Sequence, residues 1–263
     1  MKTSLEICVD SVESAVAAEC GGAQRIELVN SLVEGGLTPS LGLIRAVRSR
    51  IKIGVYVMIR PRAGDFIYSD DELAIMREDI ALAVQNKADG VVLGILTADG
   101  DVDVERTREL VELARPLEVT FHRAFDMARD IDEALRAVIR AGADRVLTSG
   151  AQPTALQGRH RIGELVRAAR GAIAIMAGGG IRAENVEAIY QATGALEFHA
   201  ALRSPVASPM KYRRSNLHLG VPGLDDTVHY VVSPADVQAL QRAITRAHTG
   251  KTEMQRSEVS SAI

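Results

Sequence analysis

Eight short apolar segments recur along the chain at intervals of roughly 20 to 37 residues, and most run into a helical pattern. This spacing is typical of a (β/α)8 barrel, in which eight parallel strands close into a cylinder inside a ring of helices. We therefore expect an α/β protein with a single TIM-barrel domain over residues 1–248. The polar, non-periodic segment 249–263 is predicted to be a flexible C-terminal tail. The predicted strands begin near Leu5, Arg25, Ile53, Gly90, Leu117, Arg145, Ala172 and Leu196.

Length and charge limit the classes of function. The chain has 263 residues, the size at which one such barrel closes. Its formal net charge of -3 gives no broad basic surface, so we expect a small molecule or metal ion as partner and no nucleic acid. No apolar stretch is long enough to span a bilayer, and no signal peptide precedes the first strand, so we expect a cytoplasmic protein without a membrane partner. The two cysteines, Cys8 and Cys20, form no disulfide framework or CxxC motif, which fits a reducing compartment.

Local signals mark helix starts and long connections. Thr38-Pro39 predicts a helix with a threonine cap and proline at its first position. Ser69 with Glu72 has the spacing of a reciprocal capping box. The connection 200–232 is long, and such connections usually cover a site or bind a partner.

Charged side chains stand near the carboxyl ends of several predicted strands. Because side chains alternate along a strand, Glu6 shares a face with Cys8, and Glu197 with His199. If these faces line the barrel, carboxylates, imidazoles and a guanidinium converge at one mouth. There Arg60 would hold an anionic substrate, while an imidazole or a carboxylate would transfer protons. The predicted ring consists of Glu6, Glu27, Arg60, His122, Glu197 and His199.

The same ring has a structural alternative, because buried charges that neutralise one another in a plug produce the same sequence pattern. We favour a functional site, since perturbed charges in a cleft usually mark one.

A glycine run after the seventh strand is a candidate anion site. Gly178, Gly179 and Gly180 would let backbone N–H groups approach an anion, and barrels often bind phosphate after strands seven and eight. A plain tight turn is the alternative. Ser149 could add a hydroxyl to this site, but nothing in the sequence pairs it with a base, so no nucleophilic role is predicted.

Ten segments of the chain resemble the CutC family, whose members are described as copper homeostasis proteins. The resemblance spans about residues 4–248 and includes the string VTFHRAFDM at 119–127. It implies a TIM-like barrel, a cytoplasmic location, homo-oligomerisation and copper binding. The matching segments are 5–8, 25–28, 34–40, 59–66, 68–70, 119–127, 145–150, 176–181, 197–199 and 210–213.

One departure from the family pattern bears on copper. Family members often have cysteines at the ends of the first two strands, and copper binding is attributed to that pair. Here Cys8 matches the first position, whereas Val29 occupies the second. Soft Cu(I) prefers thiolate and thioether ligands, so Cys8 is the candidate metal ligand, with Met58, Met176 or His199 as its possible companions.

Three functions remain open from the sequence. The first is a cytoplasmic copper-binding protein that uses Cys8 to bind Cu(I). The second is an enzyme that acts on a small anionic or phosphorylated metabolite by general acid/base chemistry. The third is a binding module in which the charged ring is only structural.

Overall fold

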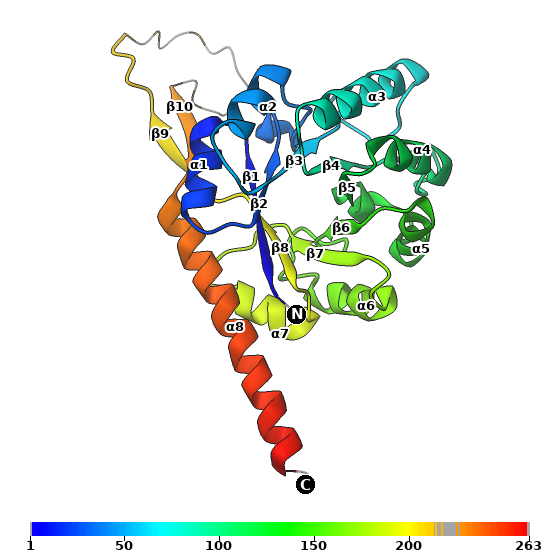
Figure 1. Cartoon of the computed structure of the whole chain (residues 1–263), viewed down its shortest axis with the longest axis vertical. Coiled ribbons are helices and arrows are strands. Elements are labelled where there is room, and N and C mark those ends of the chain that lie inside the picture. The colour runs from blue at the N-terminus through cyan, green and yellow to red at the C-terminus, as the bar shows by residue number, and fades with distance from the viewer. Residues whose placement is uncertain (1, 213, 215–216, 218–224, 226, 262–263) are drawn as a thin grey trace.

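A computed structural model describes residues 2–212, 214, 217, 225 and 227–261, apart from the side chains after residue 250. Eight parallel strands, each hydrogen-bonded to the next in sequence, form a closed barrel in which β8 pairs with β1 (Figure 1). The predicted TIM-barrel fold is confirmed, and each strand begins within two residues of its expected position. The barrel strands are β1 Ser4–Val9, β2 Arg25–Leu28, β3 Gly54–Met58, β4 Gly90–Leu93, β5 Glu118–Phe121, β6 Arg145–Thr148, β7 Ala174–Gly178 and β8 Glu197–Ala200.

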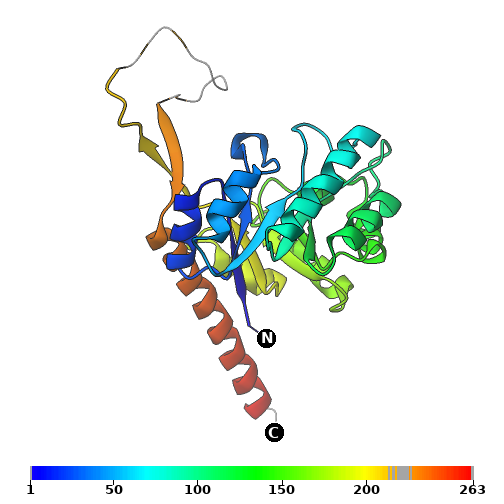
Figure 2. The same ribbon diagram turned by 45° about the horizontal axis from the view of Figure 1, so that its top comes forward.

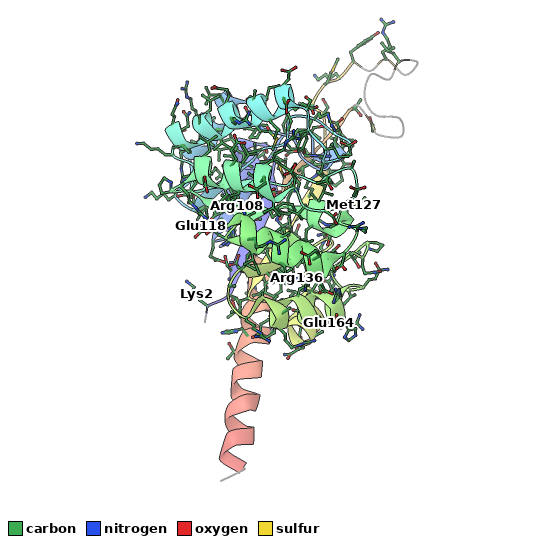
Figure 3. The ribbon with its side chains drawn as sticks, turned by 90° about the vertical axis from the view of Figure 1, so that its right-hand side faces the viewer. Lys2, Arg108, Glu118, Met127, Arg136 and Glu164 are labelled. Carbon is green, nitrogen blue, oxygen red and sulfur yellow. The ribbon has the colours of Figure 1, made fainter. Side chains whose placement is uncertain are left out.

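Helices surround the barrel, and their outer faces carry charge, as Arg108, Arg136 and Glu164 show on three of them (Figure 3). Two short 3₁₀ helices, η1 and η2, lie in the connections after β2 and β5. The helices are α1 Val12–Cys20, η1 Leu32–Glu34, α2 Leu41–Arg48, α3 Asp70–Gln85, α4 Val104–Ala114, η2 Arg123–Met127, α5 Ile131–Ala141, α6 Arg159–Ala169, α7 Val186–Thr193 and α8 Pro234–Ser261.

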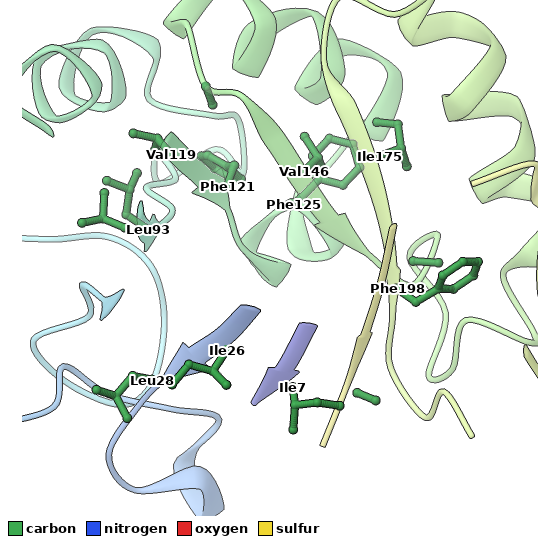
Figure 4. Packing of buried hydrophobic residues seen from close by; sticks show 14 of the residues in the cluster. Ile7, Ile26, Leu28, Leu93, Val119, Phe121, Phe125, Val146, Ile175 and Phe198 are labelled. Atoms are coloured by element: carbon green, nitrogen blue, oxygen red, sulfur yellow. The ribbon is translucent and has the colours of Figure 1, made fainter. Parts of the chain in front are cut away.

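Alternation along each strand separates two buried environments. In β1, Ile7 belongs to the large apolar cluster between strands and helices, together with Ile26 and Phe198 of neighbouring strands (Figure 4). Cys8 instead belongs to a small cluster inside the barrel that also contains Met58. The barrel interior is therefore the place where polar side chains gather, while the apolar core lies between the sheet and the helices.

One of the two predicted helix starts is confirmed and the other is wrong. Ser69 and Glu72 form the expected reciprocal capping box at the start of α3. The predicted start at Thr38-Pro39 is wrong, because α2 begins at Leu41 with Ser40 as its cap. The Thr38 hydroxyl instead accepts a hydrogen bond from the backbone N–H of Arg60 at 2.9 Å. This bond ties the loop after β2 to the end of β3.

The C-terminal part adds two elements outside the barrel. Strands β9 (Arg203–Ala207) and β10 (Val228–Val232) pair antiparallel as a ribbon that projects from the barrel (Figure 2). Arg213, the last residue of the 210–213 segment, lies outside the described residues. Helix α8 continues to Ser261, into the segment predicted as a tail, whose flexibility stays a prediction. The described part of the chain contains no helix with the length and apolar character needed to cross a membrane.

An ionic network fills the amino-terminal end of the barrel interior. The first residues of β2 and β6, Arg25 and Arg145, are buried and both bond to Glu197 at the start of β8. Glu6 bonds Arg25 at 2.6 Å, and Glu118 bonds Arg145 at 3.0 Å. Glu197 therefore lies one layer below the mouth of the barrel. It neutralises two buried guanidinium groups there, whereas Glu27, Arg60, His122 and His199 of the predicted ring line the cavity at the mouth.

Replacing Glu197 with Gln tests how far this network stabilises the barrel. The change leaves two buried guanidinium groups short of negative charge, so we expect the free energy of unfolding to fall by about 3 kcal/mol. Equilibrium urea denaturation measures the change. Glu133→Gln is the matched control, because Glu133 also bridges two arginines but is half-exposed on α5. This change should lower the free energy of unfolding by less than about 1 kcal/mol. Equal losses in the two variants would contradict this role.

Candidate functional site

A cavity of about 340 Å³ opens at the carboxyl-terminal mouth of the barrel. This is the end at which barrel proteins place their functional groups, on loops and strand ends that the closed sheet holds in position. Side chains from six strands or strand ends contribute to its wall. The polar and aromatic members include Cys8, Glu27, Arg60, Phe66, His122 and His199.

Three potential metal ligands meet on one side of this cavity. One ligand atom each from Cys8, Glu27 and His199 lies within 4.8 Å of the others. Strand register explains the meeting, because Cys8 is directly opposite Glu27 in the β1–β2 pair, and β8 flanks β1 on its other side. A thiolate, a carboxylate and an imidazole at this spacing could share one metal ion after small side-chain movements.

Glu6 lies directly below this cluster and orients His199. Its Oε1 is 2.7 Å from Nδ1 of His199, and its Oε2 accepts from Arg25. Burial opposes ionisation of Glu6, but Arg25 and His199 lower its pKa to about 2. An ionised carboxylate can only accept hydrogen bonds, so Nδ1 carries a proton and Nε2 is the ring nitrogen available to a metal. The Nε2 atom lies 3.8 Å from Glu27.

The protonation tendencies of the three cluster residues follow from burial and mutual charge. Burial and the nearby Glu27 carboxylate raise the pKa of the Cys8 thiol. Burial also raises the pKa of Glu27, with the charge of Glu6 adding to the effect. Burial acts to lower the pKa of His199, but Glu27 and Glu6 outweigh it, so the net shift is upward. Without metal the cluster thus favours bound protons, which an incoming cation must displace.

His122 occupies a different position on the cavity wall. It caps η2, where its Nδ1 accepts the backbone N–H of Ala124 at 3.1 Å, so the neutral ring carries its proton on Nε2. That Nε2 has no hydrogen-bond partner among the described residues. Burial and the positive charge of Arg60 lower the pKa of His122 to about 3. His122 is therefore a neutral hydrogen-bond donor at physiological pH, and its predicted part in proton transfer stays a prediction.

Arg60 is buried and held by backbone oxygens. Its terminal nitrogens donate to the carbonyl groups of Glu34, Gly36 and Gly64. Among the described residues no carboxylate lies within 4.0 Å of its guanidinium, and its Nε has no partner. Phe66, a cavity residue that sequence reasoning missed, packs against both Arg60 and His122, with its ring centre 5.1 Å from Arg60 Cζ and 5.0 Å from the His122 ring centre.

Gly94, also missed from the sequence, provides the space for His122. A Cβ atom at position 94 would lie 2.5 Å from Nδ1 of His122, so a larger residue would displace the ring. The signal was available as a glycine directly after the fourth strand, where backbone approach is typical.

Of the predicted anion-binding residues, Arg60 lines the cavity, whereas Ser149 and the glycine run contact residues of its wall without lining it. The Ser149 hydroxyl interacts with Asp126, Arg123 and the carbonyl of Gln152. Gly178 lies against Leu147 and His199, Gly179 against Ser149 and Arg123, and Gly180 against Thr154. The run does not open a helix directly, because α7 begins only at Val186. Neither Ser149 nor any of the three glycines belongs to the wall of the cavity.

Asp126, whose role the sequence did not reveal, organises the end of β6. It accepts hydrogen bonds from the Thr148 hydroxyl and from the backbone N–H groups of Ser149 and Ala151. It also pairs with Arg123, which contributes to the cavity wall. The 119–127 segment thus supplies His122 to the cavity and anchors the neighbouring loop.

Comparison with known proteins identifies the family of this chain. The profile of the CutC family matches residues 3–204. The chain belongs to the CutC family. It is 52% identical over 216 residues to the mouse copper homeostasis protein cutC homolog, an alignment that covers 82% of this chain and 79% of the relative. A family protein CutC from Chromobacterium violaceum is 46% identical over 247 residues, covering 94% of this chain and 100% of the relative.

A solved CutC structure supports the assignment. The protein from Streptococcus agalactiae superposes with a TM-score of 0.72 at 36% identity, covering 75% of this chain and 97% of that one. Phosphoribosylanthranilate isomerase from Pyrococcus furiosus, at 16% identity and a TM-score of 0.54, shares the fold alone.

The neutral state of His122 predicts a pH dependence of stability. Because its folded pKa is near 3 and its ordinary value is 6.5, the unfolded chain binds more protons below pH 6.5, so acidification through this window destabilises the fold. Between pH 6.5 and 5, wild-type protein should lose about 1.5 kcal/mol more than His122→Phe in urea denaturation. His160→Phe, at an exposed histidine of α6, should follow the wild-type profile. Parallel profiles for wild type and His122→Phe would exclude the effect.

Proposed function

We propose that the protein binds copper at the cluster of Cys8, Glu27 and His199, and that this binding is its part in copper homeostasis. Membership of the CutC family supports the role in copper homeostasis. The observation that carries the binding site is the convergence of three ligand atoms within 4.8 Å at the mouth of the barrel. Copper is the cargo of such a protein, not a resident cofactor.

The donor chemistry fits copper with one reservation about selectivity. Cys8 supplies a soft thiolate, which Cu(I) prefers, while Glu27 and His199 also suit borderline ions such as Cu(II) and Zn(II). Met58 lines the same cavity and packs with Cys8, so its thioether is a further soft donor at this site. The sulfur of Met176 instead accepts a hydrogen bond from Arg25 in the lower network. We therefore take Met58, not Met176, as the soft companion of Cys8.

Location and assembly are also part of the proposal. Both cysteines are free, with Cys8 buried and Cys20 exposed, as expected of thiols in the reducing cytoplasm. We infer a cytoplasmic homo-oligomer from the resemblance to the family.

Cys8→Ala removes the thiolate, so we expect copper affinity to fall at least about tenfold. Titration of the reduced protein with Cu(I) against a competing chelator, under anaerobic conditions, measures the affinity. Binding should also strengthen as pH rises, because metal must displace protons from the cluster. Cys20→Ala is the matched control, since this exposed thiol on α1 lies outside the cluster. Unchanged copper binding by Cys8→Ala would remove the proposed site.

Val29→Cys tests the departure from the family pattern. Val29 is buried and packs with Cys8, so a second thiol there adds a soft donor beside the first. We expect Cu(I) to bind about tenfold more tightly, while Zn(II) affinity rises less. The competition titrations should include both metals. Equal gains for the two ions would show that thiolate number does not set the preference of this site.

A further inference from the structure

Arg60 is a buried cation without a counter-ion. Only 6% of its surface is exposed, and no carboxylate lies within 4.0 Å of it among the described residues. Its terminal nitrogens bond to neutral carbonyl groups, which satisfy N–H groups but bring no net charge. Isolated buried charges are costly, so such a group is normally paired. The contrast with Arg25, which has two carboxylate partners in the same barrel, is marked.

A second unpartnered donor belongs to the same cavity wall. Among the residues that the structure describes, neither the Nε2 proton of His122 nor Nε of Arg60 has a hydrogen-bond acceptor. Both side chains line the cavity and both contact Phe66. Both nitrogens are buried, so a neighbouring side chain has to move before a ligand oxygen can reach them. Phe66 contacts both side chains, is partly exposed and lies in the loop after β3, so we infer that its ring shifts, at the cost of part of its contact with the apolar core.

We propose that this cavity binds a small 2-hydroxycarboxylate, whose carboxylate accepts hydrogen bonds from Arg60 and His122. The inference goes beyond copper binding and does not depend on it, because neither donor belongs to the metal cluster. A carboxylate matches the site in number and charge, since it presents two oxygens to two N–H donors and one negative charge to one guanidinium. Phosphate fits less well, because it needs more donors and would face the carboxylates of Glu27 and Glu34 on the same wall.

Glu27, another polar residue of the cavity wall, selects the hydroxyl. Oε1 of Glu27 is buried and unpartnered, so it can accept a hydrogen bond from a donor on the ligand. The intervening wall contains apolar side chains, among them Leu32, Met58 and Leu147. A volume of about 340 Å³ is at the lower end for small-molecule sites, which limits the ligand to a short chain.

Isothermal titration of the full-length, metal-free protein with lactate tests the proposal, with lactamide and inorganic phosphate as comparison probes. We expect lactate to bind, and both other probes to bind at least about tenfold more weakly. Arg60→Met should weaken lactate binding at least about tenfold, and His122→Phe about fivefold. Arg140→Met is the matched control for a lost arginine, because Arg140 is exposed on α5 far from the cavity, and it should bind lactate as wild type does.

The outcomes separate this proposal from the copper site. Cys8→Ala should keep its lactate affinity, whereas Arg60→Met should keep its copper affinity. If Arg60→Met fails to fold because the loop carbonyls lose their donor, His122→Phe decides alone. The proposal is overturned by absence of lactate binding, by lactamide or phosphate binding as tightly as lactate, or by full lactate affinity in His122→Phe.

Discussion

The buried carboxylate of Glu6 connects the two functional levels of the barrel. One oxygen pairs with Arg25 in the ionic network below, and the other holds His199 at the mouth. Both contacts are shielded from water, so neither partner can exchange Glu6 for solvent without leaving a buried charge unpaired. The orientation of His199, and with it the metal cluster, therefore depends on a network whose other members stabilise the closed sheet. Carboxylates that orient metal-binding imidazoles in this way commonly tune metal affinity.

The two ends of the barrel interior differ in how well their polar groups are satisfied. In the lower network every guanidinium meets at least one carboxylate, as a purely structural plug requires. At the mouth, Glu27, Arg60 and His122 each keep a buried polar atom that has no hydrogen-bond partner in the described part of the chain. Native interiors rarely leave such atoms unpaired unless a ligand, ion or water completes them. The structural alternative thus describes the lower layer well, and the upper layer has the character of a binding site.

Sequence periodicity was enough to predict the fold, but it could not predict how far along the barrel axis each side chain lies. The alternation along β8 correctly predicts that Glu197 and His199 share one face. A step of two residues along the strand nevertheless places Glu197 in the lower network and His199 at the mouth. A period of two gives the face of a residue and says nothing about its height in the barrel. Ser149 and the glycine run follow the expected strands, but their contacts with Asp126 and the loop around Thr154 depend on chain segments that no local pattern relates. Thr38 likewise has the residue type and position of a helix cap, but its hydroxyl instead accepts a hydrogen bond from the backbone N–H of Arg60, just after β3.

Charge balance explains how one cavity can accommodate a metal ion and an organic anion together. A Cu(II) ion at the cluster would be neutralised by the Cys8 thiolate and the Glu27 carboxylate, both of which would release their protons to solvent as the metal binds. That leaves the charge of Arg60 uncompensated, since its bonding partners are neutral carbonyl groups. A ligand carboxylate neutralises Arg60 without competing for the cluster. Its hydroxyl then meets either the free Glu27 oxygen or the metal that this oxygen binds, so the two sites are complementary and not alternatives.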